Sequence, residues 1–107
     1  MLDKAINLIY ASDTGRKDEY DYPIFEDVKT EVFVEKLSVT RSEFYTAMQS
    51  GMKPSIVFKV WYDDFELTRH DVDGKPVYAD KVEYDGNTYN ILRTYSKDET
   101  VLELVCG

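Results

Sequence analysis

The side chains that could do chemistry in this chain are few, and its single histidine and single cysteine are the first candidates. His70 and Cys106 would act as a nucleophilic pair only if both met in an exposed cleft with a third group to orient the imidazole. Cys106 lies in an alternating apolar stretch, where cysteine usually behaves as a small buried apolar side chain. We therefore expect a buried Cys106, a solvent-facing His70 in a loop, and no catalysis by this pair.

Two short motifs resemble ligand-binding loops but lack residues that such loops need. Asp71-Val72-Asp73-Gly74 resembles the start of a calcium loop, yet Asp80 stands where the loop needs a glutamate. Gly15-Arg16-Lys17 lacks the first glycine and the following Ser or Thr of a phosphate loop. One histidine and one cysteine cannot supply the four nitrogen and sulfur ligands of a zinc site. The sequence therefore predicts no metal, no cofactor and no enzyme.

The length and charge of the chain limit the classes of protein that it could belong to. Its 107 residues suit a single domain, 1–107, with one core. Twenty-one acidic against thirteen basic residues give a net charge of −8, which argues against a surface that binds duplex DNA. The first twenty residues lack the pattern of a signal peptide, and no stretch approaches the roughly 18 apolar residues of a membrane span. We expect synthesis in a cytoplasm and no membrane association.

Alternating apolar residues and many aromatics predict a mainly β fold. We expect about six strands, over residues 4–11, 28–39, 55–62, 76–84, 88–95 and 100–106, with a helix as the alternative for the first. The apolar positions shift after Val34, which predicts a β-bulge at Glu35 and Lys36. Asp85-Gly86-Asn87 predicts a tight hairpin. Together these features predict a small antiparallel β-barrel.

One short α-helix, at about residues 41–50, is predicted between the second and third strands. Thr40 and Glu43 fit a capping box at its start. Val39 and Phe44 have the spacing of a hydrophobic staple across that start. Gly51 offers a left-handed residue that closes a helix, and Pro54 prevents continuation. The apolar stripe of this helix is expected to face the barrel, because so short a helix is marginal alone.

Two long loops, at about residues 12–27 and 63–75, are expected to contact partners. The first combines six acids with interleaved aromatics, and its alternative interpretation is a plain solvated loop. Aromatic anchors in a mobile acidic loop favour an interaction segment. The second loop has turn chemistry at Asp71–Gly74 that allows a hairpin. The candidate interface residues are Asp18, Glu19, Tyr20, Asp21, Tyr22, Phe25, Phe65, His70 and Asp73.

Two motifs carry a resemblance to a known family. One is Thr-Arg-Ser-Glu-Phe-Tyr at 40–45, followed by Gly51 and Pro54, and the other spans 82–95 with Tyr-Asp-Gly-Asn-Thr-Tyr-Asn-Ile at its centre. With Glu103-Leu104 they make the chain similar to the head-tail joining proteins of tailed bacteriophages, the head-closure or stopper family. The residues that would specify the family fold are Thr40, Arg41, Glu43, Phe44, Tyr45, Gly51, Pro54, Tyr84, Gly86, Tyr89 and Arg93.

The resemblance implies a non-enzymatic subunit of the virion neck. Proteins of this family are small β-barrels that form a ring beneath the portal and adaptor, retain the packaged DNA and receive the tail. The resemblance therefore implies portal, adaptor and tail proteins as partners, a monomer in isolation, and a ring upon assembly. DNA would pass through its lumen without specific binding. The motif residues also have ordinary structural roles. We expect Gly86 to serve the turn, Tyr84 and Tyr89 to form a cross-strand pair, and Phe44 to join the helix to the barrel.

Three other functions stay open. The first is another neck or tail-completion protein. The second is an acidic inhibitor that mimics DNA, in which Asp18, Glu19 and Asp21 would bind a basic protein, although the acids show no regular ladder. The third is a small hydrolase, which would need perturbed carboxylates such as Glu31 and Glu35 in a pocket.

Overall fold

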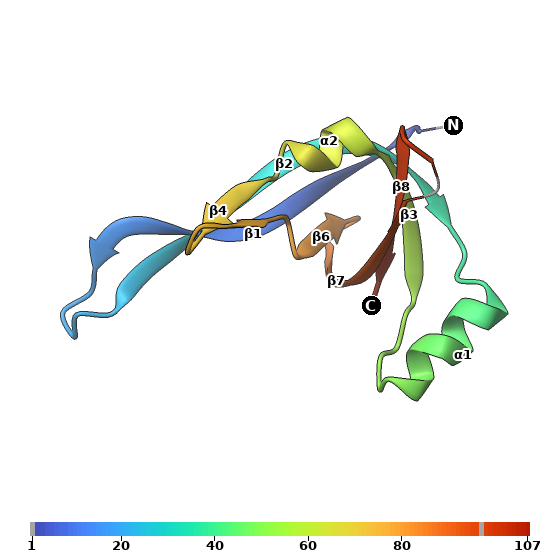
Figure 1. Cartoon of the computed structure of the whole chain (residues 1–107), viewed down its shortest axis with the longest axis horizontal. Coiled ribbons are helices and arrows are strands. Elements are labelled where there is room, and N and C mark those ends of the chain that lie inside the picture. Colours follow the sequence, from blue (N-terminus) through green and yellow to red (C-terminus); the bar gives the residue numbers. More distant parts are fainter. Residues whose placement is uncertain (1, 97) are drawn as a thin grey trace.

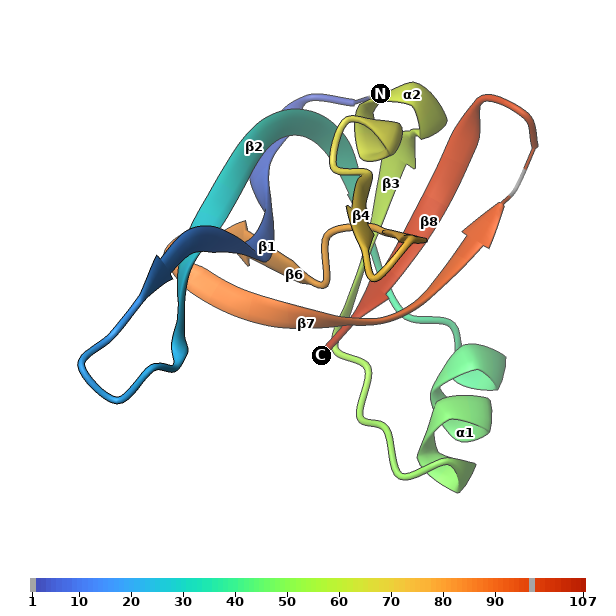
Figure 2. The same ribbon diagram turned by 60° about the vertical axis from the view of Figure 1, so that its left-hand side comes forward.

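The structure is a computed structural model that describes residues 2–96 and 98–107, without the side chain of Glu43. Six antiparallel strands pair in the order β1-β2-β3-β8-β7-β6, and β6 also pairs with β1, which closes the sheet into a barrel (Figures 1 and 2). The expected mainly β fold of about six antiparallel strands is confirmed. The barrel strands are β1 (Lys4–Lys17), β2 (Pro23–Leu37), β3 (Ile56–Trp61), β6 (Lys81–Tyr84), β7 (Asn87–Ser96) and β8 (Val101–Cys106).

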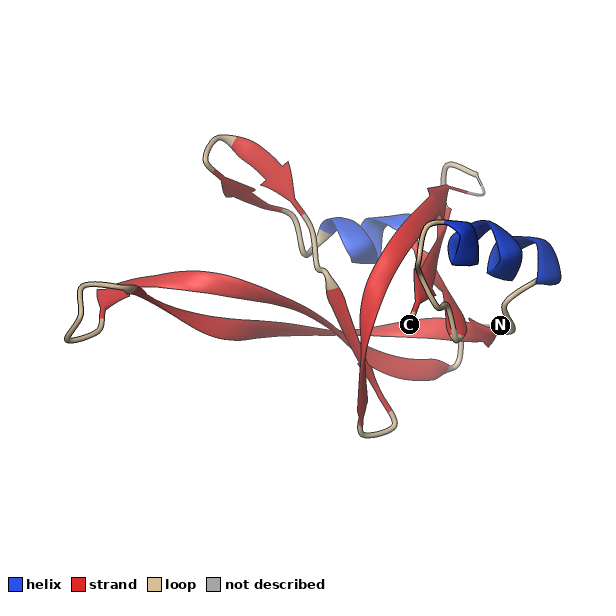
Figure 3. Ribbon diagram, turned by 90° about the horizontal axis from the view of Figure 1, so that it is seen from below, coloured by secondary structure: helices blue, strands red, loops and turns tan. Residues whose placement is uncertain are grey.

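Four further elements connect these strands. The helix α1 (Arg41–Gln49) lies between β2 and β3, as expected, and the one-turn helix α2 (Tyr62–Glu66) follows β3. The strands β4 (His70–Val72) and β5 (Lys75–Val77) form a separate hairpin. Figure 3 shows this hairpin and the long β1–β2 ribbon projecting from the barrel.

The core fills the barrel, and it is formed by side chains that the predicted alternation along the strands directs inward. Ile6 and Leu8 of the first strand and Leu102, Leu104 and Cys106 of the last are buried, as their period-two spacing indicated. The first segment is therefore a strand, and its helical alternative is wrong. The other buried apolar residues of this cluster are Val32, Val34, Ile56, Phe58, Val60, Phe65, Ala79 and Val82.

Tyr84 and Tyr89 are half-buried and pack on this core, but they are not opposite each other. The register of β6 and β7 pairs Tyr84 with Asn87 and Val82 with Tyr89. Both rings instead meet Phe58 edge-on, with ring centroids 5.3 and 6.5 Å away. The expected cross-strand pair is thus wrong, because the two-residue turn sets the register so that both tyrosines converge on one phenylalanine.

The predicted bulge at Glu35 and Lys36 is also wrong. β2 pairs with β3 without a shift, since Glu35 is opposite Lys59 and Lys36 is opposite Phe58. Lys36 lies on the same side of the strand as Val34, but it is exposed, with its Nζ atom 5.8 Å from the centroid of the Tyr84 ring. The face of an aromatic ring attracts a cation at this distance, so a lysine fits this position. The break in the apolar pattern therefore reflects one lysine rather than an extra residue.

Two predicted glycine positions are confirmed. Asp85 and Gly86 have φ angles of 51° and 79°, as a two-residue hairpin turn with two left-handed residues requires. Gly51 has a φ angle of 77° and its N–H donates to the Met48 carbonyl, while the Met52 N–H donates to the Ala47 carbonyl. This pair of bonds closes α1 as predicted. The predicted capping contact of the Glu43 side chain lies outside the described residues. Lys97 also lies outside them.

The predicted long loop at residues 12–27 is wrong. β1 and β2 continue through this stretch and leave a turn of only five residues, 18–22, between them. Nearly every residue from 11 to 27 is exposed, so this part of the ribbon has no buried face. Apolar alternation marks a strand only where one face is buried, which is why the pattern did not reveal it.

The second predicted loop, 63–75, is only partly a loop. It contains most of α2 and the hairpin of β4 and β5, whose turn is Asp73-Gly74 with φ angles of 53° and 79°. The hairpin that the turn chemistry allowed is therefore present. The predicted strand 76–84 is divided into β5 and β6, because the chain leaves its first partner at Tyr78 and joins β1 at Lys81.

Candidate functional site

The β1–β2 ribbon extends beyond the barrel as an arm, which we define as residues 11–27. β6 pairs with β1 only at residues 7–9, and β3 pairs with β2 only at residues 34–37. Within the arm, the two strands therefore pair only with each other (Figure 1). A two-stranded ribbon without a covering layer is marginally stable in water.

The tip of the arm is an ordered turn. The Asp18 carboxylate accepts the N–H groups of Tyr20 at 2.9 Å and Tyr22 at 3.0 Å. The Asp18 N–H donates to the Tyr22 carbonyl at 2.9 Å, and Lys17 forms an ion pair with Asp21 at 3.5 Å. Asp21 adopts a left-handed conformation, with a φ angle of 67°. Asp18 and Asp21 thus shape the turn, through hydrogen bonds of the Asp18 carboxylate and the left-handed backbone of Asp21.

Three aromatic side chains of the arm are exposed, as predicted. The exposed fractions are 73% for Tyr20, 67% for Tyr22 and 59% for Phe25. The acid Glu19 is also exposed beside them. Exposed tyrosine and phenylalanine side chains that carry large apolar area are typical of protein-protein interfaces.

The helix α1 is the second exposed apolar element. Phe44, Tyr45 and Met48 are 40%, 60% and 43% exposed, and the first two rings meet edge-on. Among the described side chains of α1 only Ala47 is buried. The expectation that Phe44 joins the helix to the barrel is wrong, because α1 lies beside the barrel rather than on it (Figure 2).

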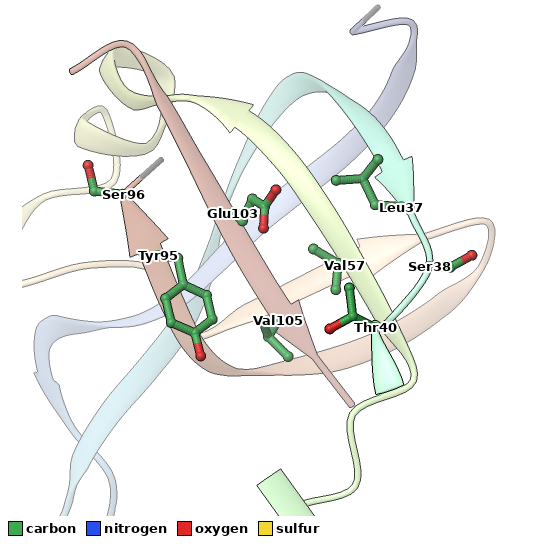
Figure 4. A pocket seen from close by; sticks show the side chains of 8 residues that line it. All are labelled: Leu37, Ser38, Thr40, Val57, Tyr95, Ser96, Glu103 and Val105. Atoms are coloured by element: carbon green, nitrogen blue, oxygen red, sulfur yellow. The ribbon is translucent and has the colours of Figure 1, made fainter. Parts of the chain in front are cut away.

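A groove of about 340 Å³ lies on the outer face of the barrel, next to the start of α1. Its floor includes Val57 and Val105, which are buried between neighbouring strands. Figure 4 shows the side chains that line it: Leu37, Ser38, Thr40, Val57, Tyr95, Ser96, Glu103 and Val105. The lining offers one carboxylate and several hydroxyls above an apolar floor, which suits contact with another protein surface.

Arg93 lies on the same outer face as this groove. Its guanidinium carbon is 4.5 Å from the centroid of the Tyr95 ring, on the same strand. The register of β7 shifts between Ile91 and Arg93, after which Arg93 is opposite Val105, a residue of the groove. The motif residues Thr40, Arg93 and Tyr95 are thus brought to one region, although they are far apart in the sequence.

A second groove, of about 480 Å³, separates the base of the arm from the β4–β5 hairpin. Its lining includes Asp13, Phe25, His70, Asp71 and Asp73. Three of the predicted interface residues, Phe25, His70 and Asp73, therefore share this groove. They come from two loops that the sequence analysis treated separately.

His70 is not the solvent-facing loop residue that we expected. It begins β4, is half-buried and stacks on Tyr10, with ring centroids 4.0 Å apart. The reason is that the hairpin folds back toward β1, so the imidazole covers the tyrosine where β1 leaves the barrel. Nothing in the local sequence marks this contact between residues 60 positions apart.

The prediction that Phe65 is an exposed interface residue is wrong. Its exposed fraction is 7%, and its ring stacks on Tyr78 at 5.3 Å. The single turn of α2 directs Phe65 toward the core cluster, which a loop assignment did not anticipate. The Tyr78 hydroxyl donates to Glu66 at 3.1 Å, and this bond raises the pKa of Tyr78.

Thr68 is a buried polar residue that the sequence analysis missed. Its hydroxyl donates to the Phe65 carbonyl at 2.8 Å and accepts the Ala79 N–H at 3.0 Å. It therefore joins α2 to the segment before β6. A lone threonine in a polar stretch carries no signal of this role.

The candidate nucleophilic pair is separated. Cys106 is fully buried in the barrel core, as predicted, and burial raises the pKa of its thiol to about 12. At neutral pH it is a protonated thiol and no nucleophile. No group of three or more His, Cys, Asp or Glu side chains in the described part of the chain is placed to hold a metal ion.

Comparison with known proteins assigns no family to the chain. No protein-family profile and no curated protein matches its sequence. Among the described residues, no helix is long and apolar enough to cross a membrane. The exposed arm and the exposed helix α1 are therefore the features on which a functional proposal rests.

Proposed function

We propose that the protein is a structural, non-enzymatic subunit of the head-tail connector, or neck, of a tailed bacteriophage. It acts as a head-closure or stopper subunit that docks beneath the portal-adaptor ring, retains the packaged DNA and provides the surface for tail attachment. It is made in the cytoplasm of the bacterial host and resides in the virion neck.

The observation that carries this proposal is the presence of two projecting elements on a closed barrel. The arm and α1 leave the barrel in different directions, and each exposes aromatic side chains to water (Figures 1 and 3). Neither a two-stranded ribbon nor a nine-residue helix is stable by itself. A protein that maintains such elements uncovered is suited to burying them against neighbouring proteins in an assembly.

The motif residues and the charge of the chain give further support. Gly51 and Gly86 occupy the backbone conformations that the motifs require, and Tyr84 and Tyr89 pack on the core. The net charge of −8 suits a conduit through which DNA must slide, because carboxylates do not form the counterion-releasing contacts that would hold it.

The test uses heads of the phage whose genome encodes the chain. Deletion of the gene should give DNA-filled heads that lack tails and lose DNA on storage. Purified protein added to freshly prepared heads should co-sediment with them and restore tail attachment. The proposal would be contradicted if the purified protein did not bind filled heads, or if the deletion mutant still produced infectious particles. Reading frames for portal, capsid and adaptor just upstream of the gene are expected.

A further inference from the structure

We propose that the arm of one copy of the protein docks on α1 of a second copy, in a head-to-tail contact. This inference deepens the proposed function, because it names the two surfaces through which ring subunits would meet.

Both surfaces consist of apolar side chains that the chain itself leaves uncovered. On the arm these are Tyr20, Tyr22 and Phe25, with exposed fractions between 59% and 73%. On α1 they are Phe44, Tyr45 and Met48, with exposed fractions between 40% and 60%. Six large apolar side chains in two groups form the kind of aromatic centre that dominates the energy of protein interfaces.

The two surfaces lie at different ends of the molecule. The chain measures 48 Å along its longest axis, and Figure 1 shows the tip of the arm at one end of that axis and α1 at the other. The arm of one chain therefore cannot cover its own helix. A contact between them requires two copies.

Charge favours the arm-to-helix contact over a symmetric one. Residues 12–27 carry six acidic and two basic side chains, a net charge of −4. Residues 38–54 carry two basic residues and one acid, a net charge of +1. Pairing two arms would bring two strongly negative segments together, whereas pairing the arm with α1 brings opposite charges together.

The charged residues are placed around the aromatic ones on both sides. Asp18, Glu19 and Asp21 surround the tyrosines of the arm tip, while Arg41 and Lys53 flank α1 and are exposed. An apolar centre with a charged rim is the usual anatomy of an interface. The acidic rim of the arm would thus face the basic residues at the two ends of the helix.

A contact between two different surfaces can be repeated. Each copy presents one arm and one helix, so every copy binds two neighbours, and the assembly becomes a ring if the rotation closes or a filament if it does not. We expect a single contact to be weak, because each surface offers only three large apolar side chains, whereas stable interfaces involve about 20–30 residues on each partner. Closure makes each copy bind twice, which reconciles a monomer in dilute solution with a ring on assembly.

The test places one cysteine on each surface without removing an aromatic side chain. Arg16→Cys lies next to the arm tip and Gln49→Cys at the end of α1. Both residues are exposed, and neither belongs to the aromatic groups or the charged rim. Native Cys106 does not interfere, since it is buried and its thiol pKa is about 12. The purified variants are treated with a short bismaleimide crosslinker at high protein concentration and separated on a denaturing gel.

The double variant Arg16→Cys/Gln49→Cys should give a ladder of dimers, trimers and larger species. A mixture of the two single variants should give only the heterodimer, and each single variant alone should stay monomeric. Adding Tyr20→Ser and Tyr22→Ser to the double variant should abolish the ladder. The matched control is Leu67→Ser, which removes a side chain that is 68% exposed elsewhere on the surface and should leave the ladder intact.

Homodimers of either single variant as abundant as the heterodimer would overturn the proposal in favour of a symmetric contact. Monomer in every sample would overturn it outright. The experiment uses free protein, so its failure is distinguishable from failure of the proposed function. If the heads bind the protein but the ladder is absent, the neck role stands and this contact is rejected. If the ladder forms but the heads do not bind the protein, this contact stands and the neck role is rejected.

Discussion

The imidazole of His70 lies nearly flat on the phenol ring of Tyr10, with the two planes inclined by 14° and the centroids 4.0 Å apart. The His70 Nδ1 atom is 2.9 Å from the Thr68 carbonyl oxygen, and because a carbonyl can only accept, the Nδ1–H donates to it. The pair fastens the β4–β5 hairpin to β1 at the base of the arm. It thereby fixes one wall of the groove in which Phe25 and Asp73 lie.

Replacing His70 should destabilise the protein. His70→Ala loses a ring stack worth about 0.5–1.5 kcal/mol and a hydrogen bond worth about 1 kcal/mol, so we expect the free energy of unfolding to fall by about 2 kcal/mol. His70→Phe keeps the stack and should lose roughly half as much. Urea unfolding measures both variants. An unchanged midpoint for His70→Ala would show that the stack does not hold the hairpin.

Thr68→Val should destabilise the fold more than its small change in side-chain volume suggests. The valine leaves the buried Ala79 N–H without its acceptor, which costs about 1–3 kcal/mol. Thr68→Ser keeps the hydroxyl and is the matched control. Thermal unfolding should rank wild type first, then the serine variant, then the valine variant. Equal stability of the two variants would contradict the role of the hydroxyl.

The sequence predicted the barrel because its strands carry apolar residues at every second position on the face that forms the core. Ile6, Leu8, Leu102 and Leu104 are buried at a spacing of two, and Asp85-Gly86 sets a turn that only a few residue types can form. These are local signals, and the structure agrees with them.

The arm and the role of His70 could not be predicted in the same way. The strands of the arm are held by backbone hydrogen bonds with water on both faces, so their side chains follow no period. The stack of His70 on Tyr10 joins distant residues, and the five residues of α2 are too few for a helical pattern to emerge. Exposed aromatics at the arm tip were recognisable only because such residues are unusual in an acidic segment.

Alkaline pH should weaken the fold through Cys106. Its pKa is raised to about 12 in the folded chain, above the ordinary value of about 8.5. As the pH rises, the thiol of the unfolded chain therefore ionises before that of the folded chain. The stability that the buried, protonated thiol contributes is fully present below about pH 8.5 and is lost as the pH rises toward 12. The free energy of unfolding should fall by up to ~1.4 kcal/mol per pH unit in that window.

Cys106→Ala is the control for this pH dependence. The difference in stability between wild type and Cys106→Ala should shrink from pH 8 to pH 10, as measured by urea unfolding. The raised pKa values of Tyr62 and Tyr78, both of which arise chiefly from the hydrogen bond to Glu66, affect both proteins equally. A constant difference across this range would mean that the thiol is not desolvated.

Removing the exposed aromatics should abolish assembly and leave the fold intact. The triple variant Tyr20→Ser/Tyr22→Ser/Phe25→Ser changes side chains that contribute little to the core, so its free energy of unfolding should stay within about 0.5 kcal/mol of wild type. Its binding to DNA-filled heads should be lost, whereas Leu67→Ser should bind normally. Normal binding by the triple variant would show that these arm residues are not part of the docking surface.

The most direct measurement is a cryo-electron microscopy reconstruction of the neck of the complete virion from the phage that encodes this chain. The account predicts a ring of copies of this barrel between the adaptor and the tail, with each arm and each α1 buried against a neighbouring protein. A neck in which no density fits the barrel, or a ring whose arms and helices project freely into solvent, would contradict it.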